Sequence, residues 1–524
     1  MFNRNYLITG VCCLITYLIY LLAEYLITGG QMGVPLDDTW IHFQFADNFS
    51  QGYFFQFNKG EYTAGTTSPL YVIALGSLSL VSDNFIVISL ILSSLFHLLS
   101  CIFIYKISLE IFRSDTTVVS VLNEGNKSPE FAALLVSLLT VFNGRFSWSA
   151  LSGMETTMFT FFCILGVFVH IKNLAKSNFS ILPALLISFA TVSRPEGFLL
   201  FSLYILDLTL NLLFIRKFKE NFFRLVLSVA LFLMITFPYL VFSYKISGHF
   251  FPNTFRGQGG GLHFIPDPEY LGIALKYFIN DNFITALLYS VSVVYYLISF
   301  KFYFTKLKLV NLTFLWIIFL PLISSVLIPN WRHHVRYMIP LIPFINTAAV
   351  YMLYNLTESG KFIFLRKLNL RKYGFYVILL FSFVNFLVFA AALGKNTDNI
   401  NNQQVKLARW VNENVPREET IAVNDIGAIG FINKNKIIDM AGLITPEILR
   451  YRTYNWKDNL DSVNYLLKKN NVNYIIIYDE WFKEFLNQNR DNLTFITSAY
   501  LEDNTICGGK EMKIYKTNFN GNHK

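Results

Sequence analysis

Eleven runs of mostly apolar residues constrain this chain more than any other feature. A helix needs about 20 such residues to cross a bilayer, with roughly 17 to 25 tolerated. Apolar residues make up 54% of the 524 positions and charged residues only 15%, whereas soluble domains carry about 25% charged residues. This composition excludes a disordered chain, a disulfide scaffold and an ordinary soluble enzyme. We predict membrane spans near 6–27, 84–105, 131–149, 156–171, 179–193, 197–215, 223–244, 283–300, 311–329, 338–357 and 374–394.

The distribution of Lys and Arg predicts how these spans are oriented. Basic residues favour cytoplasmic connections, and every second connection, beginning with 1–5, holds 18 of the 43 basic residues. The opposite connections hold 8, and the tail after 394 holds the remaining 17. We therefore expect a multi-pass protein of the plasma membrane, in a bacterium the inner membrane, with a cytoplasmic N-terminus and an extracytoplasmic tail. The net charge of +9 then reflects topology, and no nucleic-acid partner is expected.

Two apolar segments near the N-terminus are open to other interpretations. Run 6–27 follows Arg4 as a signal peptide would, but it is long and lacks a small-residue cleavage site, so a retained anchor is expected. Residues 69–82 are apolar enough for a span, yet a full crossing there would reverse every later loop and break the charge pattern. We interpret 69–82 as a surface or re-entrant helix on the outer side.

The last 130 residues have a different composition and predict a second domain. Residues 395–524 carry 17 basic and 16 acidic side chains. Val405, Ala408 and Val411 recur at helical spacing before Pro416, and a second helical set is Leu460, Val463 and Leu467. Ile421 and Val423 alternate as in a strand before a turn at 424–427, and 437–438 and 474–478 are typical of buried strands. We expect a membrane domain over 1–394 and an extracytoplasmic α/β domain over 395–524.

Adjacent carboxylates stand at the start of the first outer loop, at Asp37 and Asp38. Carboxylates at a membrane boundary are costly to desolvate, and each raises the proton affinity of the other. Such a group can take a proton from a hydroxyl as a general base, or can bind a divalent metal. A helix N-cap is the simpler interpretation, and the two residues alone do not decide between these roles.

Later outer loops add charged and amide side chains on the same side of the membrane. Basic groups facing acidic ones suit an anionic ligand. Each has a simpler explanation: Arg194 could pair with Glu196, and Arg332 could anchor to headgroups. His333 and His334 resemble a metal pair, but adjacent helical residues point about 100° apart. The residues in question are Glu155, Arg194, Glu196, Lys245, His249, Asn253, Arg332 and Arg336.

A set of short motifs follows a fixed order along the chain: Asp37-Asp38-Thr39-Trp40-Ile41, Gly65-Thr66-Thr67-Ser68-Pro69-Leu70, Ser152-Gly153-Met154-Glu155-Thr156, Arg194-Pro195-Glu196-Gly197, Pro252-Asn253-Thr254, Arg336-Tyr337 before Pro340, and Asp425-Ile426-Gly427-Ala428-Ile429-Gly430. No single motif is specific, but their order is. Together they resemble the C-type (GT-C) glycosyltransferases, most closely the mycobacterial-type arabinofuranosyltransferases and their bacterial relatives, and the resemblance covers residues 30 to 445. It implies a GT-C membrane fold with about 11 to 13 transmembrane helices.

The resemblance implies an enzyme that takes a sugar from a polyprenyl-phosphate donor and inverts its anomeric centre. The acceptor would be a glycan, lipid or protein hydroxyl of the cell envelope, and membrane lipids would surround the donor tail. Asp37 is then the expected base, with Asp38 positioning it or the acceptor. A divalent metal, if used, would bind these two residues. Donor phosphate is assigned to Arg336 and Arg194, with Lys245 and Arg332 as further candidates, and sugar or acceptor binding to Glu155, Asn253, His249 and Glu196.

The tail domain and the overall function each leave alternatives open. The domain either holds the acceptor near the site, through Asp425 or Asp439, or acts as a structural cap. A transporter would also need many spans, but its site would lie near the midplane. A polymerase or ligase using a lipid-diphosphate donor would employ the Arg332–Arg336 loop and leave Asp37 without a role. A receptor or scaffold would explain the spans but not the charged loops.

Overall fold

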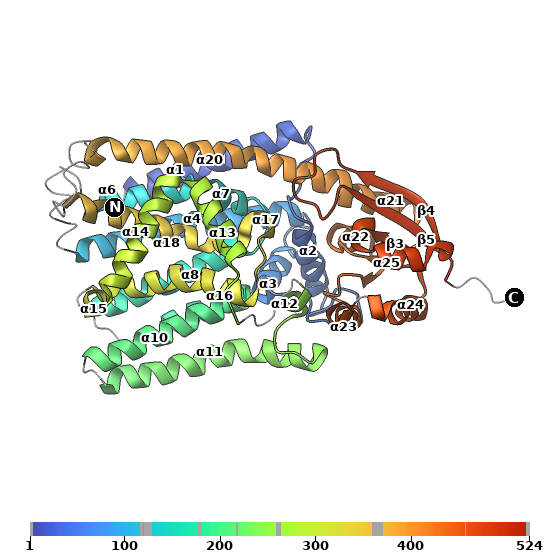
Figure 1. Ribbon diagram of the computed structural model, residues 1–524, viewed down its shortest axis with the longest axis horizontal. Coiled ribbons are helices and arrows are strands. Elements are labelled where there is room, and N and C mark those ends of the chain that lie inside the picture. The colour runs from blue at the N-terminus through green and yellow to red at the C-terminus, as the bar shows by residue number, and fades with distance from the viewer. Residues whose placement is uncertain are drawn as a thin grey trace.

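The computed structural model describes residues 4–115, 119, 128–176, 180–215, 218–257, 264–305, 307–358, 370–455 and 457–519. It consists of a thick layer of helices followed by a smaller domain built on one sheet, with the N-terminus at the end of the helical layer away from that sheet (Figure 1).

The described parts of the eleven predicted spans overlap helices, which confirms a polytopic helical membrane protein. The predicted spans 179–193, 197–215 and 283–300 fall on shorter apolar helices, Leu182–Ser193, Gly197–Asn211 and Phe283–Ile298. Among the described residues, seven helices are long and apolar enough to cross a membrane, and one bent pair makes an eighth. The pair bends by 65° after Val141, where Asn143 caps the second helix by accepting the Phe146 N–H. The helices of this layer are α1 (Arg4–Ile27), α4 (Phe85–Ser114), α6 (Pro129–Val141), α7 (Gly144–Ala150), α8 (Thr156–Lys176), α9 (Leu182–Ser193), α10 (Gly197–Ile215), α11 (Phe218–Ser247), α13 (Pro268–Asp281), α14 (Phe283–Ile298), α15 (Phe300–Thr305), α16 (Asn311–Leu327), α18 (Ile342–Glu358) and α20 (Leu370–Ile400).

The loops facing the sheet domain contain short helices rather than further spans. α3 (Pro69–Leu78) starts at a proline and has ten residues, so it is about 15 Å long, half the thickness of a hydrocarbon core. It packs beside α2 (Asp37–Ser50), as expected for a surface or re-entrant helix. The other short elements are α12 (Asn253–Gly257) and α17 (Arg332–Val335), a single turn with non-helical residues at 333 and 334, followed by the 3-10 helix η2 (Arg336–Leu341).

The C-terminal domain is a small α/β unit, as predicted. Its sheet has the order β2-β1-β3-β5-β4, with β2, β1 and β3 parallel and β5 and β4 antiparallel. The helical sets predicted near 405–411 and 460–467 form α21 and α24, whereas β4 and β5 had no predicted counterpart. The elements are α21 (Lys406–Asn414), β1 (Thr420–Val423), α22 (Gly427–Asn433), β2 (Lys436–Asp439), α23 (Pro446–Asn455), α24 (Leu460–Lys469), β3 (Val472–Ile477), α25 (Lys483–Gln488), β4 (Leu493–Tyr500) and β5 (Glu511–Thr517).

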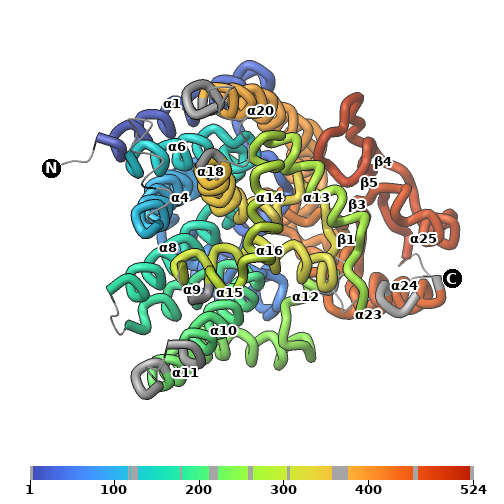
Figure 2. Tube along the Cα trace, turned by 60° about the vertical axis from the view of Figure 1, so that its left-hand side comes forward, coloured from blue at the N-terminus to red at the C-terminus, as the bar shows by residue number. Residues whose placement is uncertain are grey.

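The two parts are joined by a continuous helix and by a packed interface. α20 passes into one π-helical turn, Asn401–Val405, and then directly into α21. On the other side of the interface α22 packs against α2, where Phe431 contacts Trp40 and Phe43. The site described below lies at this interface, whereas α10 and α11 lie together at one edge of the layer, opposite α1 and α20 (Figures 1 and 2).

Candidate active site

Asp37 is the first residue of α2, and the C-terminal domain holds its carboxylate. One oxygen accepts the Gly427 N–H and the other accepts the Ala428 N–H, each at 2.8 Å. Position 427 requires glycine, because a Cβ there would lie 2.1 Å from the Asp37 carbonyl oxygen. Asp37 therefore accepts N–H groups at the start of α22, 390 residues away in sequence, and does not cap its own helix, whose N-cap residue is Leu36.

The surroundings of Asp37 favour its protonated form near neutral pH. Burial first, and the charge of Asp425 second, raise the pKa of Asp37 to about 8, although the two backbone hydrogen bonds oppose the change. Asp425 is fixed beside it by hydrogen bonds from Gln404 at 3.0 Å and from the Tyr478 hydroxyl at 2.8 Å. A carboxyl group with a pKa near the working pH is suited to general-base chemistry.

Asp38 makes an ion pair with Arg336, with 2.7 Å between Oδ2 and Nη2. Burial opposes ionisation of Asp38, but the charge of Arg336 outweighs it and holds the pKa of Asp38 below its usual range. The other terminal nitrogen of Arg336, Nη1, is buried and has no hydrogen-bond partner among the described residues. A buried guanidinium N–H without a partner costs stability, so this group is available to an anionic ligand.

A strained turn places Arg336. The three preceding residues, 333–335, have φ values of 53°, 61° and 53°, and the third is β-branched, for which this region is a genuine outlier. Arg145 donates to the His334 carbonyl at 3.1 Å and makes a fully buried ion pair with Asp281. Strain of this kind persists only where surrounding contacts enforce it, and it concentrates at functional sites.

An apolar cavity of about 220 Å³ opens beside the ion pair between Asp38 and Arg336. Its charged end contains Asp38, Glu155, Arg194, Glu196 and Arg336. The remainder is lined mainly by side chains of α10 and α16 and by the segment before α12, including Phe198, Leu199, Phe251, Leu320, Ile323 and Leu327. We call this space the apolar cavity.

Arg194 is held between two carboxylates at the charged end of the apolar cavity. Nη1 lies 2.8 Å from Glu155 and Nη2 lies 2.7 Å from Glu196. His42 contacts the second oxygen of Glu155 at 3.1 Å. Although burial opposes ionisation, the hydrogen bond with His42 and the charge of Arg194 lower the pKa of Glu155 to about 2. Arg194 does pair with Glu196, as the simpler interpretation predicted, but within a larger buried cluster.

A second space, the polar cavity, lies between the helical layer and the C-terminal domain. Its volume is about 500 Å³, and its lining includes Asp37, Asn330, Trp331, Arg332, His333, Gln404, Asp425 and Trp481. The two cavities adjoin, because both are lined by Asp38, Ile41, Arg336, Tyr337 and Leu443. The Asp38–Arg336 pair thus stands at the junction of an apolar space and a polar one.

The structure brings together most of the residues singled out in the sequence, but not all of them. Arg332 lines the polar cavity, with its guanidinium 5.4 Å from the ring centre of Trp481. Lys245 and His249, at and beyond the exposed end of α11, line neither cavity. The buried Asn253 also lines neither, and its side-chain amide donates to the Leu443 carbonyl at 3.2 Å.

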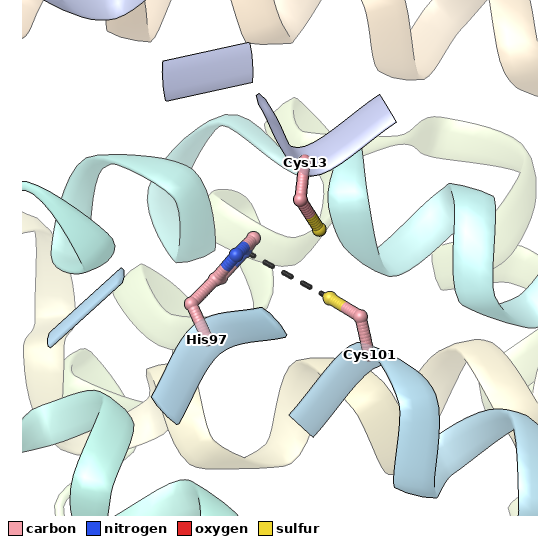
Figure 3. Close-up of side chains that lie close together, drawn as sticks. All are labelled: Cys13, His97 and Cys101. Atoms are coloured by element: carbon pink, nitrogen blue, oxygen red, sulfur yellow. Dashed lines mark hydrogen bonds between the residues drawn. The ribbon is translucent and has the colours of Figure 1, made fainter. Parts of the chain in front are cut away.

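Among the described residues, one group of three potential metal ligands lies elsewhere, within the membrane layer. Cys13 of α1 and His97 and Cys101 of α4 point toward one another, with their ligand atoms within 4.8 Å (Figure 3). His97 also contacts the Tyr17 hydroxyl at 2.9 Å. Asp37 and Asp38 belong to no such group of three among the described residues. Backbone N–H groups engage the first and Arg336 engages the second.

Several site residues were not identified in the sequence. His42 follows Asp38 by four positions and therefore shares its helix face, a signal that could have found it. Gln404, Tyr478 and Trp481 come from the C-terminal domain, and no sequence pattern connects them to Asp37.

Comparison with known proteins gives one sequence match and several structural ones. Residues 398–515 match a domain of unknown function (DUF8728). No protein of curated function matches the sequence.

The structural matches cover nearly the whole chain. ArnT from Cupriavidus metallidurans, solved with bound undecaprenyl phosphate, aligns over 96% of this chain and 97% of its own at 12% identity and a TM-score of 0.58. The oligosaccharyltransferase AglB from Archaeoglobus fulgidus, in complex with an inhibitory peptide and a dolichol-phosphate, aligns over 96% of this chain and 74% of its own at 12% identity and 0.59. The mycobacterial arabinofuranosyltransferase AftD aligns over 97% of this chain and 40% of its own, at 13% identity and a TM-score of 0.42, too low to support any detail. The chain has the fold of the GT-C glycosyltransferases, as the order of its motifs predicted.

Proposed function

We propose that this protein is a membrane glycosyltransferase that transfers a sugar from a polyprenyl-phosphate donor to an acceptor hydroxyl on the extracytoplasmic side. One observation carries the proposal: Asp38 and Arg336 stand where an apolar cavity among the helices meets a polar cavity under the C-terminal domain. A reaction between a lipid-linked donor and a water-soluble group needs such a junction. The solved relatives with bound undecaprenyl phosphate or dolichol-phosphate support the same class of donor.

The donor would occupy the apolar cavity, with its first isoprene units against the side chains of α10 and α16. Its phosphate would accept from Nη1 of Arg336, which has no partner among the described residues. Charge-assisted hydrogen bonds from a fixed guanidinium stabilise a leaving phosphate most strongly where water is excluded. Arg194 is the second cation of this cavity, but two carboxylates already hold it. Its main role would be to order Glu155 and Glu196 for the sugar.

The acceptor would enter the polar cavity and present its hydroxyl to Asp37. Asp37 takes the hydroxyl proton as the acceptor oxygen bonds to the anomeric carbon. The bond from that carbon to the phosphate oxygen breaks with its electron pair, and polyprenyl phosphate leaves from the opposite face. One such displacement inverts the anomeric centre. Asp38, held by Arg336, positions the reacting groups. Arg332 lines the polar cavity, so we propose for it a role with the acceptor in place of the donor-phosphate role expected from the sequence.

A divalent cation would bind Asp37 and Asp38, if one is used. The apolar cavity is lined by three carboxylates and two guanidinium groups, so a donor phosphate adds to an acidic surplus that a cation would offset. Such a cation would share or replace the present partners of Asp37 and Asp38. Loss of turnover in EDTA, restored by Mg²⁺ or Mn²⁺, is the result expected for a metal-dependent enzyme.

The test is transfer in proteoliposomes with sugars linked to undecaprenyl by a single phosphate, both pentoses and hexoses. The wild type should release undecaprenyl phosphate, and Asp37→Asn should abolish this while still binding undecaprenyl phosphate. Asp47→Asn serves as the control, because Asp47 lies on the same helix and pairs with Lys434 at the interface. Turnover only with diphosphate-linked donors would identify a polymerase or ligase. Solute flux without any glycosyl transfer would identify a transporter, and full activity in Asp37→Asn would refute the assigned base.

A further inference from the structure

A turn of the C-terminal domain reaches into the junction of the two cavities. It follows β2 and runs from Asp439 to Ile444. The buried Asp439 carboxylate accepts the backbone N–H groups of Ala441, Leu443 and Ile444. Gly442 has a φ of 85°, and a Cβ there would lie 2.6 Å from Leu449, so glycine is needed for both conformation and space. These contacts give the turn one defined shape.

The membrane part holds the tip of this turn from two sides. Asn253 donates its side-chain amide to the Leu443 carbonyl at 3.2 Å. The Leu443 side chain lies against α12, since a Cβ on Gly257 would be 2.8 Å from its Cδ2. Next to it, a Cβ on Gly65 would be 2.8 Å from Ile444. Leu443 is thus wedged between the segment after α2 and α12.

Leu443 is also one of five residues that line both cavities, and it is the one among them that comes from the C-terminal domain. Two of the other four, Asp38 and Arg336, form the ion pair assigned to the reaction. Ile41 lies on α2 and Tyr337 on η2. Leu443 therefore supplies the C-terminal domain's part of the wall that the two cavities share, next to Ile41 and Tyr337.

We propose that Leu443 determines whether the acceptor or water attacks the donor, because it closes the apolar cavity to water from the polar cavity. This inference rests on the proposed function. Without the seal, a water molecule would lose a proton to Asp37 and bond to the anomeric carbon. The carbon–phosphate oxygen bond would break, giving free sugar and polyprenyl phosphate. Exclusion of water is a recognised way in which closed sites prevent such hydrolysis.

The experiment measures two products from one donor, the free sugar and the glycosylated acceptor. The probe is the single-phosphate undecaprenyl sugar that the wild type turns over, labelled in the sugar. We expect Leu443→Ala to raise the ratio of hydrolysis to transfer about tenfold or more, because it opens a path between the cavities. Leu443→Val should raise it less, and Leu443→Met, which keeps the volume, should leave it near the wild-type value.

A control separates this role from loss of stability. Leu467→Ala removes the same atoms from a fully buried position in the core of the C-terminal domain, where it packs with Val463 and Ile475. It should lower the melting temperature and total activity without changing the product ratio. An unchanged ratio in Leu443→Ala and Leu443→Val, with wild-type transfer present, refutes the seal but leaves the proposed function intact. Failure of the wild type to transfer or hydrolyse any lipid-phosphate sugar refutes both.

Discussion

The pKa of Asp37 gives the most direct test of its role as a base, because a second carboxylate sets part of it. Burial and the charge of Asp425 raise this pKa from 3.8 to about 8. A base acts only when deprotonated, so transfer by the wild type should rise about tenfold per pH unit below pH 7 and level off above pH 8. Asp425→Asn removes the neighbouring charge while keeping a similar shape. It should lower the pKa of Asp37 by about one, equivalent to ~1.4 kcal/mol.

The assay is the initial rate of transfer in proteoliposomes between pH 5.5 and 9.5. At pH 6.5, lowering the pKa from about 8 to about 7 makes the deprotonated fraction roughly eightfold larger. The ratio of the rate at pH 6.5 to the rate at pH 9 should therefore be higher in Asp425→Asn than in the wild type by about that factor. Because the two groups titrate together, the midpoint belongs to the pair in the wild type and to Asp37 alone in the variant. Asp47→Asn should keep the wild-type profile. An unchanged midpoint of the pH–rate profile in Asp425→Asn would refute the argument that the Asp425 charge raises the pKa of Asp37. If Asp37→Asn kept the wild-type fall in rate at low pH, the assignment of Asp37 as the base would be refuted.

Two further substitutions test the phosphate site and the interface. Arg336→Ala should weaken undecaprenyl phosphate binding in nanodiscs by about 10- to 100-fold, since hydrogen bonds to charged groups contribute about 1.5–3 kcal/mol each. Arg409→Ala, on the exposed face of α21, should not weaken it, and a change only in acceptor affinity would contradict the assignment. Gly427→Ala forces a Cβ into Asp37 and should cost about 1–3 kcal/mol together with most of the activity. Gly272→Ala on α13, where a Cβ meets nothing within 4 Å, should retain the wild-type melting temperature, and equal melting temperatures for both variants would contradict the close approach.

The membrane layer could be predicted from sequence because its signal is local. Apolar runs of span length report directly on burial in lipid or protein, and the described part of each of the eleven overlaps one helix or two consecutive helices. The sheet domain was predicted in outline for the same reason, since buried strands such as 474–478 are continuous apolar runs. β4 has an exposed edge pattern and no comparable run, which is why the antiparallel half of the sheet escaped prediction.

The site could be predicted only in part because its geometry depends on distant contacts. Asp37, Asp38, Arg194 and Arg336 stood out as charges at a membrane boundary, where charge is costly. Nothing local indicates that Asp37 meets the start of α22 or that the backbone before Arg336 is left-handed. Lys245 carries the same charge as Arg336, yet it stands in the last turn of α11 and lines neither cavity.

The contact between Asp37 and α22 also determines when the site can form during synthesis of the chain. The chain emerges from the ribosome N-terminus first, at about 5–20 residues per second. The two N–H groups that order Asp37 lie 390 residues later and are made some 20–80 seconds after it. During that interval the helices can already be in the membrane while the Asp37 carboxylate lacks these two hydrogen bonds. A chain that ends or stalls before α22 is therefore expected to be inert, and under the proposed function sugar transfer would begin only after the C-terminal domain has folded against α2.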